Sequence, residues 1–321
     1  MKTIQTIPLE QIDVLDGTFS VNFMADLRRL RSSIEEIGLI QPVLLRARGD
    51  GYQIVCGFRR ISIMQALGHG EIESRVLKEK EMDDYHLFSI SLHDNITTRE
   101  LNTVEKSIAL DKLVHHFKID SSIVVNTFLP LFSLEPNEKI LNTYVSLAQM
   151  EDQVKEYVLK EEVSRSNIRR FLTMTSEDRM AVLSMIIPLR LGENRLREIL
   201  TLLEEISRRD QLTLRDIVGW QAIQAVLSRP ELTPSQKTER VKKVLMGLRY
   251  PRMRRLEEGF EKTRKQLSLP SKVSLGHPPY FEGKGMRIEF EFETLEEYRS
   301  MLSSLSRLAD QEKFQEMIQS H

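Results

Sequence analysis

A change of hydrophobic period at Gly57 constrains the fold of this chain more than any other feature. Residues 42–47 and 52–56 are short apolar runs joined by Gly49, Asp50 and Gly51, a sequence typical of a tight turn between two strands. Residues 57–68 then begin and end with glycine, as expected for a helix that starts directly after the second strand. This order predicts a mixed α/β unit with the start of the helix at the edge of a sheet.

The surrounding sequence extends this unit over residues 1–119. Asn102 and Glu105 have the spacing of a capping box, which marks the start of a helix. The other expected elements are an apolar segment at 3–12, a helix over roughly 24–38 that ends at Gly38, a strand at 72–77, and helices near 81–93 and 103–118.

Two further regions follow, and the chain is helix-rich overall. The middle shows only helical spacing of its apolar residues, interrupted by Pro136, Pro188 and Gly192. Residues 228–236 combine Pro, Ser and Thr without periodicity, which is typical of a linker. We therefore expect three domains, over residues 1–119, 120–228 and 229–321, with the linker at the start of the third.

The third domain is expected to be a small α+β unit. A basic amphipathic helix is interrupted at Pro251, and strands are expected at 272–276 and 286–293. The second strand alternates strictly, with its apolar residues on one side, and Thr294 with Glu297 caps a final helix. A helix–strand–strand–helix unit leaves open strand edges and an apolar helix face, which a second copy of the chain would cover.

Composition excludes several classes of protein. The 321 residues carry 46 Lys and Arg against 47 Asp and Glu, so the chain is not a uniformly basic coat for nucleic acid. One cysteine cannot form an internal disulfide or supply a multi-cysteine metal site. No stretch reaches the roughly 18 apolar residues that would span a membrane. We expect a soluble cytoplasmic protein without a membrane partner.

The near-neutral total conceals segregated charge. Residues 236–272 contain twelve basic and four acidic residues, whereas residues 119–164 contain three basic and eight acidic ones. A segment with eight excess positive charges is expected to engage several phosphates in a salt-dependent way. The alternative is a solvated helix face, although acids that fail to alternate with the bases weaken that interpretation.

Two segments of the first domain carry candidate chemistry. Gly57 opens a helix whose free N–H groups lie beside Arg59 and Arg60, the geometry of a phosphate-binding corner. Asp94 and Asn95 are adjacent oxygen ligands of the kind that hold hydrated Mg²⁺ against phosphate. Taken singly, the two segments could equally be a surface helix that starts with two arginines and a polar junction between helices.

Taken together, these segments and their flanks resemble a known family. Residues 32–46, 52–68 and 94–110 resemble the N-terminal domain of ParB-type chromosome and plasmid partition proteins. The helical middle and the C-terminal unit extend the resemblance over nearly the whole chain. It implies a ParB/sulfiredoxin-like α+β domain, an all-α middle with a helix-turn-helix, and a C-terminal dimerisation domain.

The resemblance also implies a ligand. In that family the N-terminal domain binds CTP with Mg²⁺, and nucleotide binding closes a dimeric clamp around DNA. Asp94 matches a position implicated in hydrolysis, which would serve as a switch, and Asn95 matches a metal-binding position. The nucleotide-binding residues implied by the resemblance are Gln41, Gly57, Phe58, Arg59, Arg60, Asn95 and Arg99.

The chain departs from the family pattern at two points. The usual glutamate before the paired arginines is Phe58, and Thr98 replaces an arginine, with Arg99 one residue away. Sulfiredoxin, an enzyme with a related fold, places its reactive cysteine where this chain has Phe58. Cys56 lies before Gly57 at a strand end and is expected to be a buried apolar residue, which disfavours redox repair.

The middle domain is expected to hold the helix-turn-helix, with helices at 121–129 and 136–148. Its acidic charge, including Glu138 in the second helix, opposes phosphate binding, so a helical linker that no longer reads a specific site is the alternative. The candidate DNA contacts are Asn137, Asn142, Thr143, Arg165, Arg169 and Arg170.

By the same resemblance, the third domain is expected to dimerise and to contact DNA without sequence preference. The candidate DNA contacts there are Lys242, Lys243, Arg252, Arg254 and Arg255. The candidate dimerisation residues are Phe260, Ile288, Phe290, Phe292, Leu302 and Leu305.

The leading hypothesis from sequence is a nucleoid-associated, ParB-like DNA partition protein, a homodimer with a ParA-type ATPase as its family partner. One alternative is a nucleotide-dependent phosphotransferase or nuclease on the same fold. Another is a DNA-binding regulator that uses no nucleotide.

Overall fold

The computed structural model describes residues 3–267, 269–270, 272–278 and 285–319. The chain divides into two compact units, Met1–Leu196 and Arg197–His321. Within the described residues, no helix is both long enough and apolar enough to cross a membrane.

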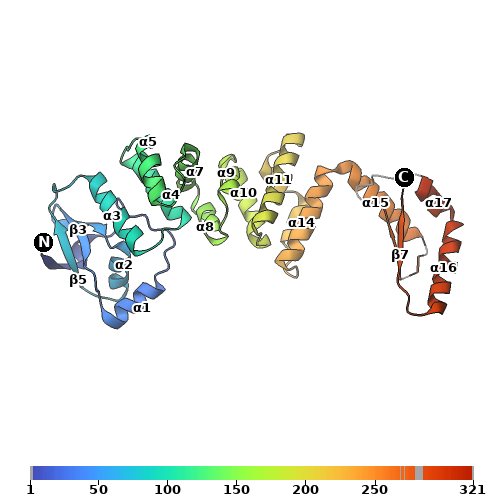
Figure 1. The fold of residues 1–321 in the computed structure, drawn as a ribbon, viewed down its shortest axis with the longest axis horizontal. Coiled ribbons are helices and arrows are strands. Elements are labelled where there is room, and N and C mark those ends of the chain that lie inside the picture. Colours follow the sequence, from blue (N-terminus) through green and yellow to red (C-terminus); the bar gives the residue numbers. More distant parts are fainter. Residues whose placement is uncertain (1–2, 268, 271, 279–284, 320–321) are drawn as a thin grey trace. The chain divides into compact units, whose positions relative to one another are not determined.

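The first unit begins with a mixed five-stranded sheet in the order β1-β5-β3-β4-β2 (Figure 1). The two predicted strands and their turn are confirmed, because β3 and β4 pair antiparallel and Gly49 in the turn has a φ of 56°. β3 also pairs parallel with β5, and β1 pairs antiparallel with β5. The strands are β1 (Ile4–Pro8), β2 (Ile12–Asp13), β3 (Val43–Arg48), β4 (Gly51–Cys56) and β5 (Glu71–Leu77), with a 3-10 turn, η1, at Leu9–Gln11.

Helices cover both faces of this sheet because adjacent strand residues point to opposite sides. Ile54 packs in one apolar cluster with residues of α1 (Arg28–Ile37) and α2 (Phe58–Ala66). Val55 packs in another with residues of α3 (Asp84–Thr98) and α4 (Thr103–Asp111). The corner at Gly57 therefore lies between the two layers.

The helix boundaries differ from the sequence prediction in places. α1 begins at Arg28 instead of near residue 24, and α3 continues to Thr98 beyond the expected end near 93. The predicted capping box is confirmed, since Asn102 and Glu105 each accept a hydrogen bond from the other's backbone N–H. After α4 the expected helix continues as a π-helical turn, η2 (Lys112–His116).

The rest of the first unit is helical, as predicted. The two helices expected for the helix-turn-helix are present, the first running over 121–131 with a π-helical turn inside it, and the second starting at Glu138. The elements are α5 (Ser121–Ile123), η3 (Val124–Phe128), α6 (Leu129–Leu131), α7 (Glu138–Ala148), α8 (Asp152–Lys160), α9 (Arg165–Leu172), α10 (Ser176–Ile186) and the 3-10 turn η4 (Ile187–Leu189). α11 (Glu193–Asp210) begins before the end of this unit.

The second unit places a helix start inside the predicted linker. Thr233 and Gln236 form a capping box, so α14 begins at Pro234. Of the predicted linker, residues 228–233 are without helix. The elements are α12 (Leu214–Val218), α13 (Gln221–Leu227), α14 (Pro234–Arg249), α15 (Pro251–Gln266), β6 (Val273–Gly276), β7 (Arg287–Phe290), α16 (Leu295–Ala309) and α17 (Glu312–Gln319).

The two expected C-terminal strands are present and pair antiparallel, but β7 is shorter than the predicted 286–293. Phe260 of α15 is 4% exposed and packs with Leu275 and Leu308. Since Phe260 belongs to the core of its own chain, it does not face a partner, and we remove it from the dimerisation residues. Part of the segment between β6 and β7 lies outside the described residues.

Candidate functional site

Only glycine fits at position 57, where β4 meets α2. It precedes the first turn of α2 with a φ of 102°, in the left-handed region that glycine favours. A Cβ at this position would lie 2.6 Å from Cγ1 of Val43 on the adjacent strand. The first N–H groups of α2 have no acceptor within the helix, which makes this end suited to an anion.

Arg60 is fixed to the backbone that precedes β3. Its Nη1 donates to the carbonyl oxygens of Gln41 and Pro42 at 2.8 and 3.2 Å. Its Nη2 lies 3.6 Å from the carboxylate of Asp94 on α3. The guanidinium therefore bridges three segments that are distant in sequence.

A buried ion-pair cluster lies beside it. Glu105 of α4 is 1% exposed, and its two carboxylate oxygens accept hydrogen bonds from Arg59 at 2.6 Å and Arg99 at 2.5 Å. Two cations share one carboxylate, so the cluster keeps an excess positive charge. Burial, together with the nearby Arg99, lowers the pKa of the Arg59 guanidinium.

Asn22 holds the two arginines of this cluster from the opposite side. Its Oδ1 accepts hydrogen bonds from Nε of Arg59 at 2.8 Å and from Nη2 of Arg99 at 3.4 Å. Asn22 lies in the loop between β2 and α1, which has no periodicity, so sequence reasoning missed it. Glu105 was recognised only as a helix cap, because its pairing with Arg59 spans 46 residues of chain.

One cleft of about 510 Å³ is lined by Asn22, Gly57, Arg59, Arg60 and Arg99, but not by Glu105. It contains every nucleotide-binding residue that the sequence predicted, together with Asp94, and four arginines line it against two aspartates. The sequence did not predict Ser20, Val21, Asn22, Asp26, Arg29 and Leu30 as lining residues. Hydrogen bonds from Arg28 lower the pKa of Asp26, so this carboxylate stays charged at the cleft edge. The cleft suits a polyanion with a cation.

Of the two candidate metal ligands, Asp94 is placed better than Asn95. The amide of Asn95 donates to the carbonyl oxygen of Ser91 at 2.8 Å, and its Oδ1 faces the guanidinium of Arg99 at 3.1 Å. A second cation at that oxygen would be repelled by Arg99. The half-exposed carboxylate of Asp94 can take the place of one oxygen in the shell of a hydrated, phosphate-bound Mg²⁺.

Cys56 is buried, as predicted. It is 4% exposed, and burial beside the Asp94 carboxylate raises the pKa of its thiol to about 12, against a smaller opposing effect of Arg60. The thiol is therefore protonated at neutral pH, which makes it a poor nucleophile.

The helix-turn-helix candidates fall into two groups. Asn142, Arg165 and Arg169 are exposed, and Arg170 is half-buried. Asn137 is also exposed, although its side chain caps α7 by accepting from the N–H of Lys139. Thr143 is 5% exposed, and its hydroxyl donates to the carbonyl oxygen of Lys139. It offers no surface to a base, so we remove Thr143 from the proposed DNA contacts.

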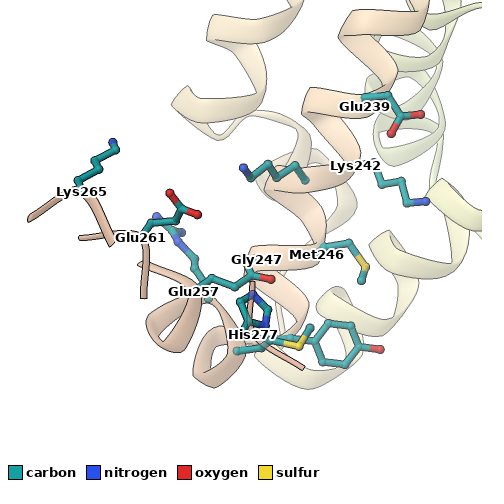
Figure 2. A pocket seen from close by; sticks show the side chains of 12 residues that line it. Glu239, Lys242, Met246, Gly247, Glu257, Glu261, Lys265 and His277 are labelled. Carbon is teal, nitrogen blue, oxygen red and sulfur yellow. The ribbon is translucent and has the colours of Figure 1, made fainter. Parts of the chain in front are cut away.

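The basic segment forms a groove of about 620 Å³ between α14 and α15 (Figure 2). Lys242, Lys243 and Arg254 line it together with acidic residues such as Glu239 and Glu257. Lys242 pairs with Glu198 and Arg254 pairs with Glu258, both at 2.7 Å, which neutralises part of the predicted positive charge. Lys243, Arg252, Arg254 and Arg255 are exposed, as a phosphate contact requires.

An apolar surface remains open beside β7. Phe290 and Phe292 form an aromatic cluster with Tyr298 of α16, with centroid distances of 4.9 to 6.1 Å. Phe292 is 51% exposed and Leu302 is 45% exposed, while Ile288 is also exposed and Leu305 is half-buried. Five of the six predicted dimerisation residues therefore leave apolar surface uncovered.

Comparison with known proteins identifies the N-terminal domain. Residues 1–96 match the family model of the ParB N-terminal domain. The mixed sheet with its arginine-lined corner thus defines a ParB-type N-terminal domain. Residues 1–96 thus contain a ParB-type N-terminal domain, as the sequence predicted.

Two relatives show how far the likeness extends. The chromosome-partitioning protein ParB of Myxococcus xanthus (strain DK1622) is 34% identical over 93 residues, which are 29% of this chain and 30% of that protein. The nucleoid occlusion protein of Bacillus thuringiensis (strain Al Hakam) is 23% identical over 208 residues, 63% of this chain and 68% of that protein. The chain thus matches less than a third of the first relative and about two thirds of the second.

Solved structures with some likeness include two of C-terminally truncated ParB from Caulobacter crescentus. The one complexed to the centromeric parS site is 21% identical and covers 60% of this chain and 95% of that chain, with a TM-score of 0.35. The one complexed with CTP-gamma-S is 22% identical and covers 58% and 99%, with a TM-score of 0.27.

Proposed function

We propose that this protein is a partition-type DNA-binding protein whose N-terminal cleft binds CTP with Mg²⁺ and whose nucleotide state controls a dimeric clamp on DNA. The observation that carries this proposal is the assembly, in one cleft, of eight residues from three distant segments that the ParB resemblance had marked. The choice of CTP rests on the resemblance, and the choice of a polyanion rests on the four arginines.

Each side chain has a defined role in this proposal. The first turn of α2, with Arg59 and Arg60, would bind the phosphates, and Arg99 would add a further cation in place of the arginine that Thr98 replaces. Asp94 would orient a hydrated Mg²⁺, which supplies charge neutralisation between phosphate oxygens. The cluster around Glu105 would hold Arg59 and Arg99 in place before the ligand arrives, which lowers the entropy cost of binding.

The second unit would supply the permanent contact between two copies. The exposed apolar residues beside β7 and on α16 would pack against the same residues of a partner subunit, as two-fold symmetry requires. The exposed cations of α14 and α15 would add contacts to DNA without sequence preference. A ParA-type ATPase remains the partner expected from the resemblance, and the nucleoid remains the expected location.

Equilibrium binding of fluorescent CTP and ATP, with Mg²⁺ and with and without DNA, tests the proposal. We expect CTP to bind, and Arg60→Ala to weaken binding about 100-fold, because a charge-assisted contact and the fixed position of Gln41 are both lost. Arg75→Ala is the matched control, since Arg75 is an exposed arginine on β5 outside the cleft.

The alternatives predict different results. Rapid release of phosphate or cutting of DNA, dependent on Asp94, would favour an enzyme on this fold. DNA binding with no nucleotide binding to the wild type would favour a regulator that does not use the cleft.

A further inference from the structure

Lys112 makes a contact that no part of the nucleotide site explains. Its Nζ donates to three backbone carbonyl oxygens of the loop between β2 and α1, those of Gly17, Thr18 and Ser20. The distances to Thr18 and Ser20 are 3.1 and 2.8 Å. Three carbonyls around one ammonium satisfy all three of its donors, which is a complete cage for this group.

The π-helical turn that carries Lys112 adds a second contact to the same loop. The N–H of Phe117 donates to the carbonyl oxygen of Lys112, an i to i+5 bond of 2.8 Å, which places the two residues above one another. In an α-helix, residues five apart would diverge by about 140°. The ring of Phe117 stacks on that of Phe19, with centroids 6.5 Å apart and an angle of 7°. The π turn thus directs both side chains to residues 17–20.

The loop held in this way continues directly into one wall of the cleft. Ser20, Val21 and Asn22 line the cleft, and Asn22 accepts hydrogen bonds from Arg59 and Arg99. The hydroxyl of Ser91 donates to the carbonyl oxygen of Phe19, which is the loop's tie to α3. Residues 14–27 belong to no helix or strand, so side-chain contacts such as these contribute to the position of the wall.

We propose that Lys112 is a positioning residue: it anchors residues 17–20 so that Asn22 holds the arginines of the cleft in their ligand-binding arrangement. Lys112 does not line the cleft. Its charge faces Asp16 of the loop and Asp111 of its own helix. The effect on nucleotide binding rests on the proposed function, whereas the anchoring of the loop does not.

Hydrogen–deuterium exchange of the nucleotide-free full chain tests the anchor. In Lys112→Met, which keeps a long stem but has no donors, amides of residues 17–23 are expected to exchange about tenfold faster than in wild type. The affinity for CTP with Mg²⁺ is expected to fall about fivefold to tenfold. Lys106→Met is the matched control. It also removes one positive charge, from α4, and among the described residues no hydrogen bond joins the Lys106 side chain to residues 17–20.

Unchanged exchange of residues 17–23 in Lys112→Met would overturn the proposal. If that variant does not fold, Lys112→Gln carries the test, since it keeps two N–H donors on a shorter stem, and its loop must exchange faster than wild type. If the loop exchanges faster in Lys112→Met but the wild type binds no CTP, the anchor is supported and the proposed nucleotide function is rejected.

Discussion

The N-terminal cleft and the α14–α15 groove both collect basic residues, but they hold them differently. In the cleft, Arg59 and Arg99 share the carboxylate of Glu105, which is 1% exposed, and Asn22 fixes them from the other side. In the groove, Arg254 is 56% exposed and pairs within its own helix. Buried charges in a fixed arrangement suit one ligand of defined shape, whereas exposed charges on mobile stems suit phosphates at variable positions.

Replacement of Gly57 is expected to have the largest effect on the cleft. In Gly57→Ala the new Cβ would meet Val43, and the backbone would keep an unfavourable φ, so the first turn of α2 must shift. We expect CTP affinity to fall at least about 100-fold in equilibrium binding. Gly68→Ala has a similar φ but open space around its Cβ, so it should keep binding near wild type. Equal losses in both variants would contradict the role of this corner.

Glu105→Gln tests whether the fixed arrangement depends on the buried carboxylate. Removing one partner of a buried ion pair leaves two arginines without compensation, so the free energy of unfolding is expected to fall by about 3 kcal/mol in denaturant titration. Glu73→Gln, at an exposed position on β5, should change it by less than about 0.5 kcal/mol. A small effect at Glu105 would mean that the cleft is no more preorganised than the groove.

Lys112, whose side chain is half-buried, gives the first unit a pH-dependent stability. Burial lowers the pKa of Lys112 to about 8 from an ordinary 10.5, an effect that Asp16 and Asp111 partly offset. Between these values the unfolded chain binds more protons, so this residue makes stability rise with pH. The free energy of unfolding of wild type, measured relative to Lys112→Met, should increase by on the order of 1–3 kcal/mol from pH 8 to 10.5. A constant difference would mean that the ammonium is not desolvated.

The smallest expected effect belongs to the exposed cations. Arg252→Gln combined with Arg255→Gln should reduce the slope of DNA affinity against salt by about two, with a uniform loss across DNA sequences. Arg60→Ala should leave that slope unchanged when no nucleotide is present. If the salt slope of DNA affinity falls in Arg60→Ala and not in the double variant, the nonspecific DNA contact lies in the first unit.

Much of the first unit could be predicted from sequence because its signals are local. The turn at Gly49, the corner at Gly57 and the capping box of Asn102 with Glu105 each depend on residues a few positions apart. Asn22 and Lys112 could not be found this way. Their roles come from contacts across 37 and up to 95 residues of chain, and one of them needs a π-helical turn.

The errors have a similar origin. Thr143 was proposed for its hydrogen-bonding side chain and Phe260 for its place on an apolar helix face, and packing within the chain buries both. The predicted linker contained a helix start, because Thr233 and Gln236 are good capping residues as well as typical loop residues.

Hydrogen–deuterium exchange of the whole chain, with and without CTP and Mg²⁺, tests the central claim most directly. The difference between the two regions predicts slower exchange on nucleotide addition at residues 20–30, 57–61 and 94–100, and no change at 236–266. Slower exchange at 236–266 alone, or no change at any of the cleft segments, would contradict the assignment of the cleft as the nucleotide site.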